Sequence, residues 1–116
     1  QASYDDLPYN TGGAADVLIL GGQLVIPGQP PLPADIAIDY ADAVARTDGR
    51  VRDVGDLRES VAIDTIDATG LFIHPAATAV SFGGGKTWLR IGARAVFDLR
   101  RGADTASELA RRVPSN

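Results

Sequence analysis

The sequence predicts a mainly β protein, and three observations support that prediction. Short runs rich in branched apolar residues recur at intervals of roughly ten residues. Glycine- and proline-containing turn signals separate these runs. The chain has 116 residues, which fits one small domain and falls short of the roughly 200 residues that a (β/α)₈ barrel needs.

The composition changes twice along the chain and divides it into three parts. Residues 1–15 show little periodicity, so we expect an amino-terminal arm. Residues 16–75 contain the recurring β runs and form the predicted β-domain. Residues 76–116 combine a glycine-rich linker with one strand and one helix, a unit that could open a barrel.

Two early β runs are separated by a pair of glycines. Val17–Leu20 and Gln23–Ile26 flank Gly21-Gly22, and glycine reaches a positive φ without steric cost. This pattern predicts a hairpin.

The next segment alternates turns and strands. Residues 27–33 contain four prolines, which predicts an extended, exposed loop because proline cannot donate to a β ladder. Residues 34–39 alternate isoleucine with smaller or polar residues and read as a half-buried strand. Asp48-Gly49 is a two-residue turn signal and predicts a second hairpin, between 44–47 and 50–54.

The remaining elements follow a polar connection at residues 56–61. Strands are predicted at 62–67, 71–73 and 94–99. Thr105 to Glu108 then matches the capping-box pattern, with apolar residues at helical spacing up to Val113 and Pro114 at the end. This pattern predicts a carboxy-terminal helix.

Four segments in order resemble one known family. They are Asp16-Val-Leu-Ile-Leu-Gly-Gly-Gln-Leu-Val-Ile26, Ala34-Asp-Ile-Ala-Ile38, Asp48-Gly-Arg-Val-Arg-Asp-Val-Gly-Asp56 and Thr65-Ile-Asp-Ala-Thr-Gly-Leu-Phe-Ile-His-Pro75. Together they resemble the amino-terminal β-domain of the amidohydrolase superfamily, most of all its D-aminoacylase, dihydroorotase and hydantoinase branches. The resemblance implies a small β-sandwich of the composite domain in that family. Residues 40–45 are a local insertion relative to the pattern.

The family's metal-binding motif is missing from the position where the resemblance places it. After the last strand, the family pattern continues as Pro-Gly-Phe-Ile-Asp-x-His-x-His, and its two histidines bind zinc. In this chain Ser81 and Gly83 stand at the two histidine positions. Neither residue offers an imidazole, so we expect no metal or other cofactor bound by this chain alone. Zinc or another divalent metal would belong to a companion chain.

Three residues are candidates for chemistry, and each has a plainer interpretation. His74 is the only histidine; it could act as a base, although a partly exposed structural imidazole is the simpler reading. Ser81 and Lys86 could form a nucleophile pair, although a flexible linker explains the surrounding sequence equally well. Gly83-Gly84-Gly85-Lys86-Thr87 lacks the first glycine of a phosphate loop, because position 80 is valine.

Charged residues towards the carboxyl end have similar alternatives. Asp98, with Asp64 and Asp67, reads as the solvent face of strands. The arginines could bind an anion, but pairing of Glu108 with Arg112 along the predicted helix is simpler. They are Arg100, Arg101, Arg111 and Arg112.

Composition limits the classes of partner. The net charge is −4 and basic residues are mostly scattered, which disfavours nucleic acid, and no apolar run is long enough to predict a membrane span. The non-Met start and the incomplete barrel suggest a fragment or subunit of an amidohydrolase-like enzyme acting on an amide, cyclic amide or related C–N bond. Its partner would be a larger barrel-containing polypeptide, in a higher oligomer. The alternatives are a non-catalytic assembly module and a self-processed hydrolase cut after Asn116. The compartment stays open, with the cytoplasm preferred over secretion.

Overall fold

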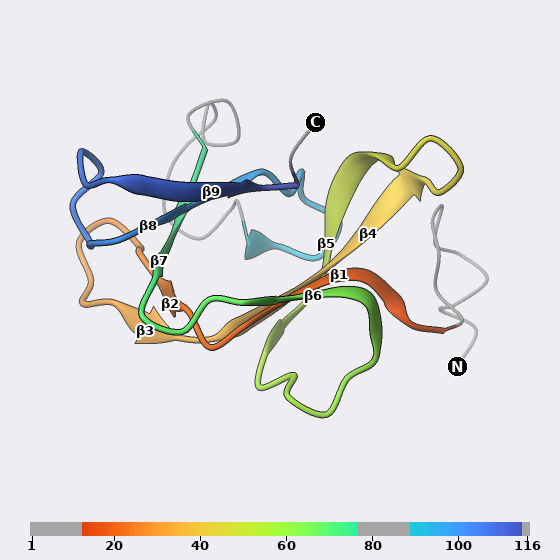
Figure 1. Cartoon of the computed structure of the whole chain (residues 1–116), viewed down its shortest axis with the longest axis horizontal. Helices are drawn as coiled ribbons and strands as arrows, with labels where there is room; N and C mark the ends of the chain where they lie inside the picture. Colours follow the sequence, from red (N-terminus) through yellow and green to blue (C-terminus); the bar gives the residue numbers. More distant parts are fainter. Residues whose placement is uncertain (1–12, 77–88, 115–116) are drawn as a thin grey trace.

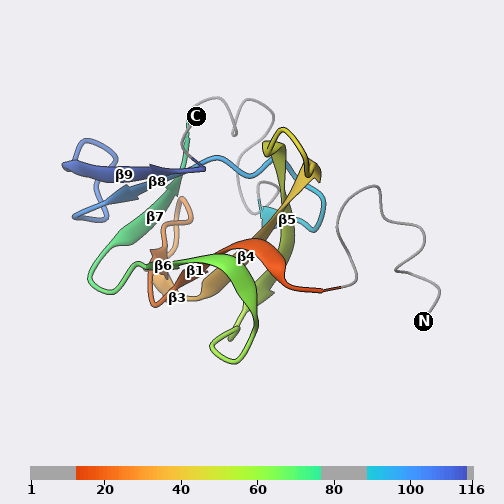
Figure 2. The same ribbon diagram turned by 45° about the vertical axis from the view of Figure 1, so that its right-hand side comes forward.

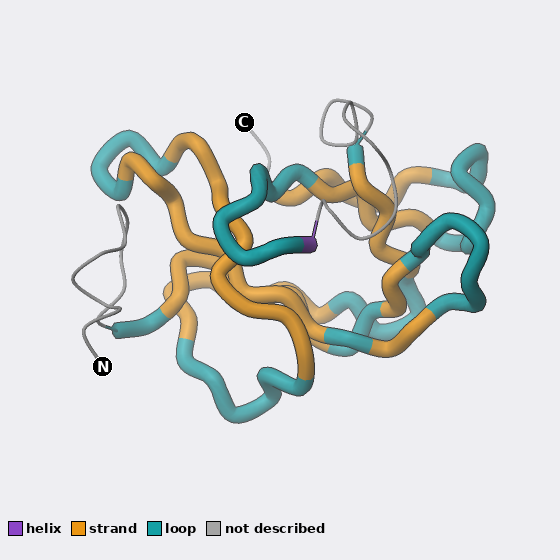
Figure 3. Tube along the Cα trace, turned by 180° about the vertical axis from the view of Figure 1, so that it is seen from behind, coloured by secondary structure: helices purple, strands orange, loops and turns teal. Residues whose placement is uncertain are grey.

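The computed structural model describes residues 13–76 and 89–114. Within these ranges the chain forms two β-sheets and no α-helix (Figure 1). Figure 3 shows how loops join the strands. The predicted class, a mainly β chain with a small sandwich, is confirmed.

The first sheet has four strands in the order β5-β4-β1-β6. They are β1 (Ala15–Leu20), β4 (Asp35–Asp42), β5 (Thr47–Gly55) and β6 (Ala62–Asp67). β1 runs antiparallel to β4 and parallel to β6. The segment around Ala93 lies alongside β5, at the edge of this sheet, because Val51 N–H donates to Ala93 O at 2.8 Å.

The second sheet has five strands in the order β3-β2-β7-β8-β9. They are β2 (Gln23–Leu24), β3 (Leu32–Pro33), β7 (Phe72–Pro75), β8 (Phe97–Arg100) and β9 (Leu109–Val113). β2 and β7 are parallel, and the remaining pairs are antiparallel. Figure 2 shows β7, β8 and β9 grouped on one side and β4 and β5 on the other.

Alternating strand residues from both sheets meet in one apolar core. Ile19 and Ile38 from the first sheet and Ile73, Phe97 and Leu99 from the second have no exposed surface. Each such side chain stabilises the fold by about 1.5–3 kcal/mol when it leaves water. The sandwich is therefore held by contacts between segments far apart in sequence.

The first predicted hairpin is wrong. β1 and β2 do not pair; they belong to different sheets, and the Gly21-Gly22 corner carries the chain from one sheet to the other. Gly21 has a φ of 81°, and a Cβ on Gly22 would lie 2.8 Å from Ile73 Cδ1. The two glycines allow the chain to pass from one sheet to the other close beneath the Ile73 side chain. The local sequence of such a crossing looks the same as that of a hairpin turn.

The second predicted hairpin, between 44–47 and 50–54, is wrong: the hairpin in this region joins β4 to β5. β4 and β5 pair from Asp35 opposite Gly55 to Asp42 opposite Thr47. The chain therefore reverses at residues 43–46, and Asp48-Gly49 lies within β5. A Cβ on Gly49 would lie 3.2 Å from Ala95 O, so this glycine permits close packing of a distant segment.

The predicted carboxy-terminal helix is also wrong. Residues 109–113 form β9, which pairs antiparallel with β8. Arg101 N–H donates to Glu108 O at 2.9 Å and closes the β8–β9 connection. Pairing with β8 overrides the local capping signal, so this extension adds strands to the second sheet and lacks the strand–helix order of a barrel.

Candidate functional site

His74 lies on β7, on the face of the second sheet that points away from the core. Its neighbour Ile73 faces the core, and its cross-strand partner is Asp98 on β8. The side chain is buried, with 2% of the residue exposed. The predicted partly exposed imidazole is therefore wrong, because the connection between β8 and β9 covers it.

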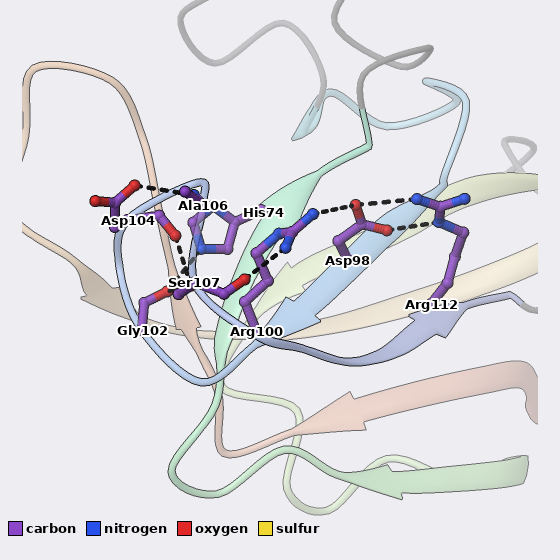
Figure 4. A network of polar contacts seen from close by, with 8 residues as sticks. All are labelled: His74, Asp98, Arg100, Gly102, Asp104, Ala106, Ser107 and Arg112. Carbon is purple, nitrogen blue, oxygen red and sulfur yellow. Dashed lines mark hydrogen bonds and ion pairs between the residues drawn. The ribbon is translucent and has the colours of Figure 1, made fainter.

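The covering loop binds His74 through its backbone (Figure 4). His74 Nε2 lies 2.9 Å from Gly102 O. Since a carbonyl only accepts, Nε2 carries the proton. Nδ1 is then left as a buried acceptor with no hydrogen-bond partner among the described residues.

Ser107 lies in the same loop, and its hydroxyl bonds to the loop backbone and makes no bond to His74. Its Oγ lies 2.9 Å from Gly102 O and 2.5 Å from Asp104 O, and its single proton is within reach of both carbonyls. Ala106 N–H donates to the Asp104 carboxylate at 2.9 Å. These bonds close the turn that sits over the imidazole.

Asp98 is the acidic residue of this cluster, and two arginines hold it. Arg112 Nε donates to Oδ1 at 2.6 Å, and Arg112 Nη2 donates to Oδ2 at 3.2 Å. Arg100 lies 3.4 Å from Oδ2 and donates to Ser107 O at 2.6 Å. Hydrogen bonding from Arg112, with the charges of both guanidinium groups, holds the pKa of Asp98 below its ordinary value.

The cluster contains serine, histidine and aspartate, yet it does not form a catalytic triad. Such a triad needs a serine bonded to histidine and a histidine bonded to the carboxylate. Here Ser107 and His74 both donate to Gly102 O, and Asp98 bonds to arginine. These bonds hold the loop on the sheet, and among the described residues His74 Nδ1 is the buried side-chain atom without a hydrogen-bond partner.

The sequence did not predict this cluster, because all the carboxylates on strands were expected to face solvent. Asp98 is buried at 4% exposed, so its prediction as a solvent-facing residue is wrong, whereas Asp64 and Asp67 are exposed. The predicted pairing of Glu108 with Arg112 is wrong as well. Glu108 lies 3.6 Å from Arg101 instead. Asp98 lies beside Arg112 because residues 109–113 form a strand that pairs with β8, which the sequence did not predict.

The other two candidates, Ser81 and Lys86, lie outside the described residues. The proposed nucleophile pair therefore stays a prediction. In the described parts of the chain, no three acidic, histidine or cysteine side chains gather closely enough to hold a metal ion. Nor does any helix there have the length and hydrophobicity of a membrane span.

Three further aspartates of the first sheet are buried and have structural partners. Asp35 accepts from Gly21 N–H at 2.8 Å and from Leu57 N–H at 2.9 Å. Asp16 accepts from Tyr40 N–H at 2.7 Å. Asp39 accepts from Asp16 N–H at 3.2 Å, and burial raises its pKa above the ordinary value although Arg52 opposes that rise. These carboxylates join β1, β4 and the loop after β5.

Comparison with known proteins identifies similar solved structures. No family model and no curated protein matches the chain. N-acyl-D-glutamate deacylase from Bordetella bronchiseptica, solved with zinc and a phosphonate inhibitor, matches 53% of the chain with 28% identity and a TM-score of 0.43. Over this region the chain resembles D-aminoacylases.

Two D-aminoacylase structures give similar values. A D366A mutant in complex with CuCl₂ and a structure from work on the binuclear metal centre each show 31% identity over 53% of this chain, with TM-scores of 0.41 and 0.42. The matched region spans 11% of each of those D-aminoacylase chains and 12% of the deacylase.

Proposed function

We propose that this chain is the small subunit or amino-terminal fragment of an amidohydrolase-like enzyme that hydrolyses an amide, cyclic amide or related C–N bond. The carrying observation is that all four family-like segments form parts of one sandwich. Residues 16–26 and 65–75 each cross from the first sheet to the second, and 34–38 and 48–56 lie largely within β4 and β5. The four segments that resemble the family in sequence order thus belong to a single folded unit.

In this proposal the metal and the catalytic groups lie mainly on a companion chain. Ser81 and Gly83 occupy the positions of the family's two zinc-binding histidines. Among the described residues, His74 is bonded to backbone and Asp98 to arginine. His74 is buried away from solvent water, and the carboxylate oxygens of Asp98 are held by arginine, so neither is placed to activate water. The chain would then contribute a folded platform against which a barrel-containing polypeptide packs.

Purification under native conditions tests the companion. The 12.1 kDa chain, tagged at one end and expressed in its native host, should elute from size-exclusion chromatography with a larger polypeptide. The pooled complex should contain stoichiometric divalent metal and hydrolyse N-acyl amino acids or cyclic amides. A folded, monodisperse 12.1 kDa species with no companion would overturn the proposal.

A second candidate function is a non-catalytic binding or assembly module derived from the same β-domain. The loss of both histidine positions favours it. The two candidates differ in the intact complex. A module predicts a stable assembly that lacks bound metal and turnover, whereas metal together with turnover excludes the module.

A further inference from the structure

A pocket opens on the side of the sandwich where β6 and β9 form the free edges of the two sheets. Its volume is about 360 Å³, within the range of roughly 300–1,000 Å³ found for small-molecule sites. Four separate stretches of the chain line it: Val17; Tyr40 and Arg46; Asp64, Thr65 and Ile66; and Arg111, Arg112, Val113 and Pro114. The pocket therefore exists only in the folded sandwich.

The lining is rich in positive charge although the chain as a whole is acidic. Three arginines and one aspartate line the pocket, whereas the chain carries a net charge of −4. Arg112 has its guanidinium on Asp98, on the opposite face of β9. Arg46 lies over the Tyr40 ring at 4.8 Å and bonds to Asp64 at 2.8 Å. A carboxylate is thus already bound to one of these guanidinium groups.

Two donors in the pocket have no hydrogen-bond partner among the described residues. Within the described part of the chain, neither the Arg111 guanidinium nor the Tyr40 hydroxyl takes part in a hydrogen bond. Arg46 uses one of its N–H groups for Asp64. Arg112 uses two of its N–H groups for Asp98. Guanidinium and phenol groups both donate to anionic oxygen.

The register of β9 explains why Arg111 faces the pocket. Its cross-strand partner is Leu99, whose side chain lies in the core, and Val113 two residues later is also buried there. Arg111 therefore occupies an inward-facing position at the sheet edge. An apolar residue would be expected at such a position unless the charge has a use.

We propose that this pocket binds a small oxyanion, a carboxylate or phosphate group, with Arg111 and the Tyr40 hydroxyl as donors and Arg46 as the third contact. The anion neutralises charge that the protein leaves uncompensated. The inference goes beyond the proposed subunit role and does not depend on a companion chain.

Titration of the ¹⁵N-labelled 116-residue chain tests the proposal. Inorganic phosphate and succinate are added separately at constant ionic strength, balanced with sodium chloride. Saturable amide shifts should appear at residues 64–66 and 111–113. Response to phosphate alone, succinate alone or both identifies the oxyanion that the site accepts, and the absence of saturable shifts with either probe overturns the proposal.

Two variants and a matched control localise the binding. Arg111→Ala should weaken binding at least tenfold, and Tyr40→Phe several-fold, since the latter retains the ring under Arg46. Arg94→Ala should bind like the unmodified chain; Arg94 is also exposed and without a side-chain partner among the described residues, but lies outside the pocket. Equal weakening in Arg111→Ala and Arg94→Ala would show non-specific charge attraction and overturn the proposal.

A charged residue at an inward edge position can also serve to prevent edge-to-edge aggregation. That role predicts a different result. Arg111→Ala would then aggregate in light scattering, while the unmodified chain showed no saturable shift with phosphate or succinate. That combination would likewise overturn the oxyanion site.

Discussion

Arg112 pairs with Asp98 directly across β9 and β8, with its Nε and Nη2 donating to the two carboxylate oxygens at 2.6 and 3.2 Å. The carboxylate side chain is only 6% exposed, whereas the arginine is 53% exposed. This contact fastens the edge strand β9 to the sheet. Charge-assisted bonds with two contacts are among the stronger side-chain hydrogen bonds.

Asp98→Asn should lower the free energy of unfolding by about 1–3 kcal/mol, because the buried group loses its charge-assisted bonds. Urea denaturation followed by circular dichroism measures the change. Asp64→Asn is the matched control, since Asp64 also pairs with an arginine but is 61% exposed; its effect should stay within about 0.5 kcal/mol. Equal losses would contradict the importance of burial here.

The Asp98 contribution should also depend on pH. The pKa of Asp98 is lowered from its ordinary value of 3.8 in the folded chain, so the unfolded chain binds the proton more tightly. The stability difference between the unmodified chain and Asp98→Asn should be complete above about pH 4 and shrink as the pH falls through the folded pKa. Urea midpoints between pH 2 and 6 measure it; a constant difference would contradict the prediction.

Asp35→Asn should weaken the corner that joins the two sheets. The buried carboxylate accepts from Gly21 N–H and Leu57 N–H, and an amide can accept at only one of these places. We expect a loss of about 1–3 kcal/mol and faster hydrogen exchange of one of the two amides. Asp42→Asn is the control because its bond to Ala45 N–H is exposed. Unchanged exchange at both amides would argue against this role.

Gly22→Ala should destabilise the fold by overpacking. The added Cβ would approach Ile73 Cδ1 to 2.8 Å and Ala68 Cβ to 3.2 Å, and such insertions typically cost about 1–3 kcal/mol. A Cβ on Gly13 would meet no atom of the described residues within 4 Å, so Gly13→Ala should be neutral. Thermal unfolding of both variants provides the measurement. A neutral Gly22→Ala would show that the corner adapts.

His74 should resist chemical modification in the folded chain. The residue is 2% exposed and is the single histidine, so diethyl pyrocarbonate can be followed by absorbance without interference. An untagged chain should react slowly in buffer and at the rate of free histidine in urea. Rapid reaction in buffer would mean that the loop over His74 opens readily, and would restore its candidacy as an accessible base.

The sequence by itself determined the β class, the positions of most strands and the absence of the family's two histidines. The predicted strands 34–39 and 62–67 correspond to β4 (Asp35–Asp42) and β6 (Ala62–Asp67), because branched apolar residues favour strands. The prediction that the first of them is half-buried is wrong, since residues 35–40 are all buried. The predicted proline loop at 27–33 is exposed throughout, but its last two residues, Leu32 and Pro33, form the short edge strand β3 against β2. Proline is tolerated there because an edge strand does not need every N–H in the ladder.

Only the tertiary structure decided which strands pair and which charges are buried. Gly21-Gly22 crosses between sheets, and residues 109–113 form a strand against β8 despite a helical pattern. Both outcomes depend on partners distant in sequence, whose pairing and packing outweigh local propensities of a few tenths of a kcal/mol to about 1 kcal/mol per residue. Asp98, Arg111 and Arg112 acquired their environments from that choice, because a strand places alternate side chains on opposite faces.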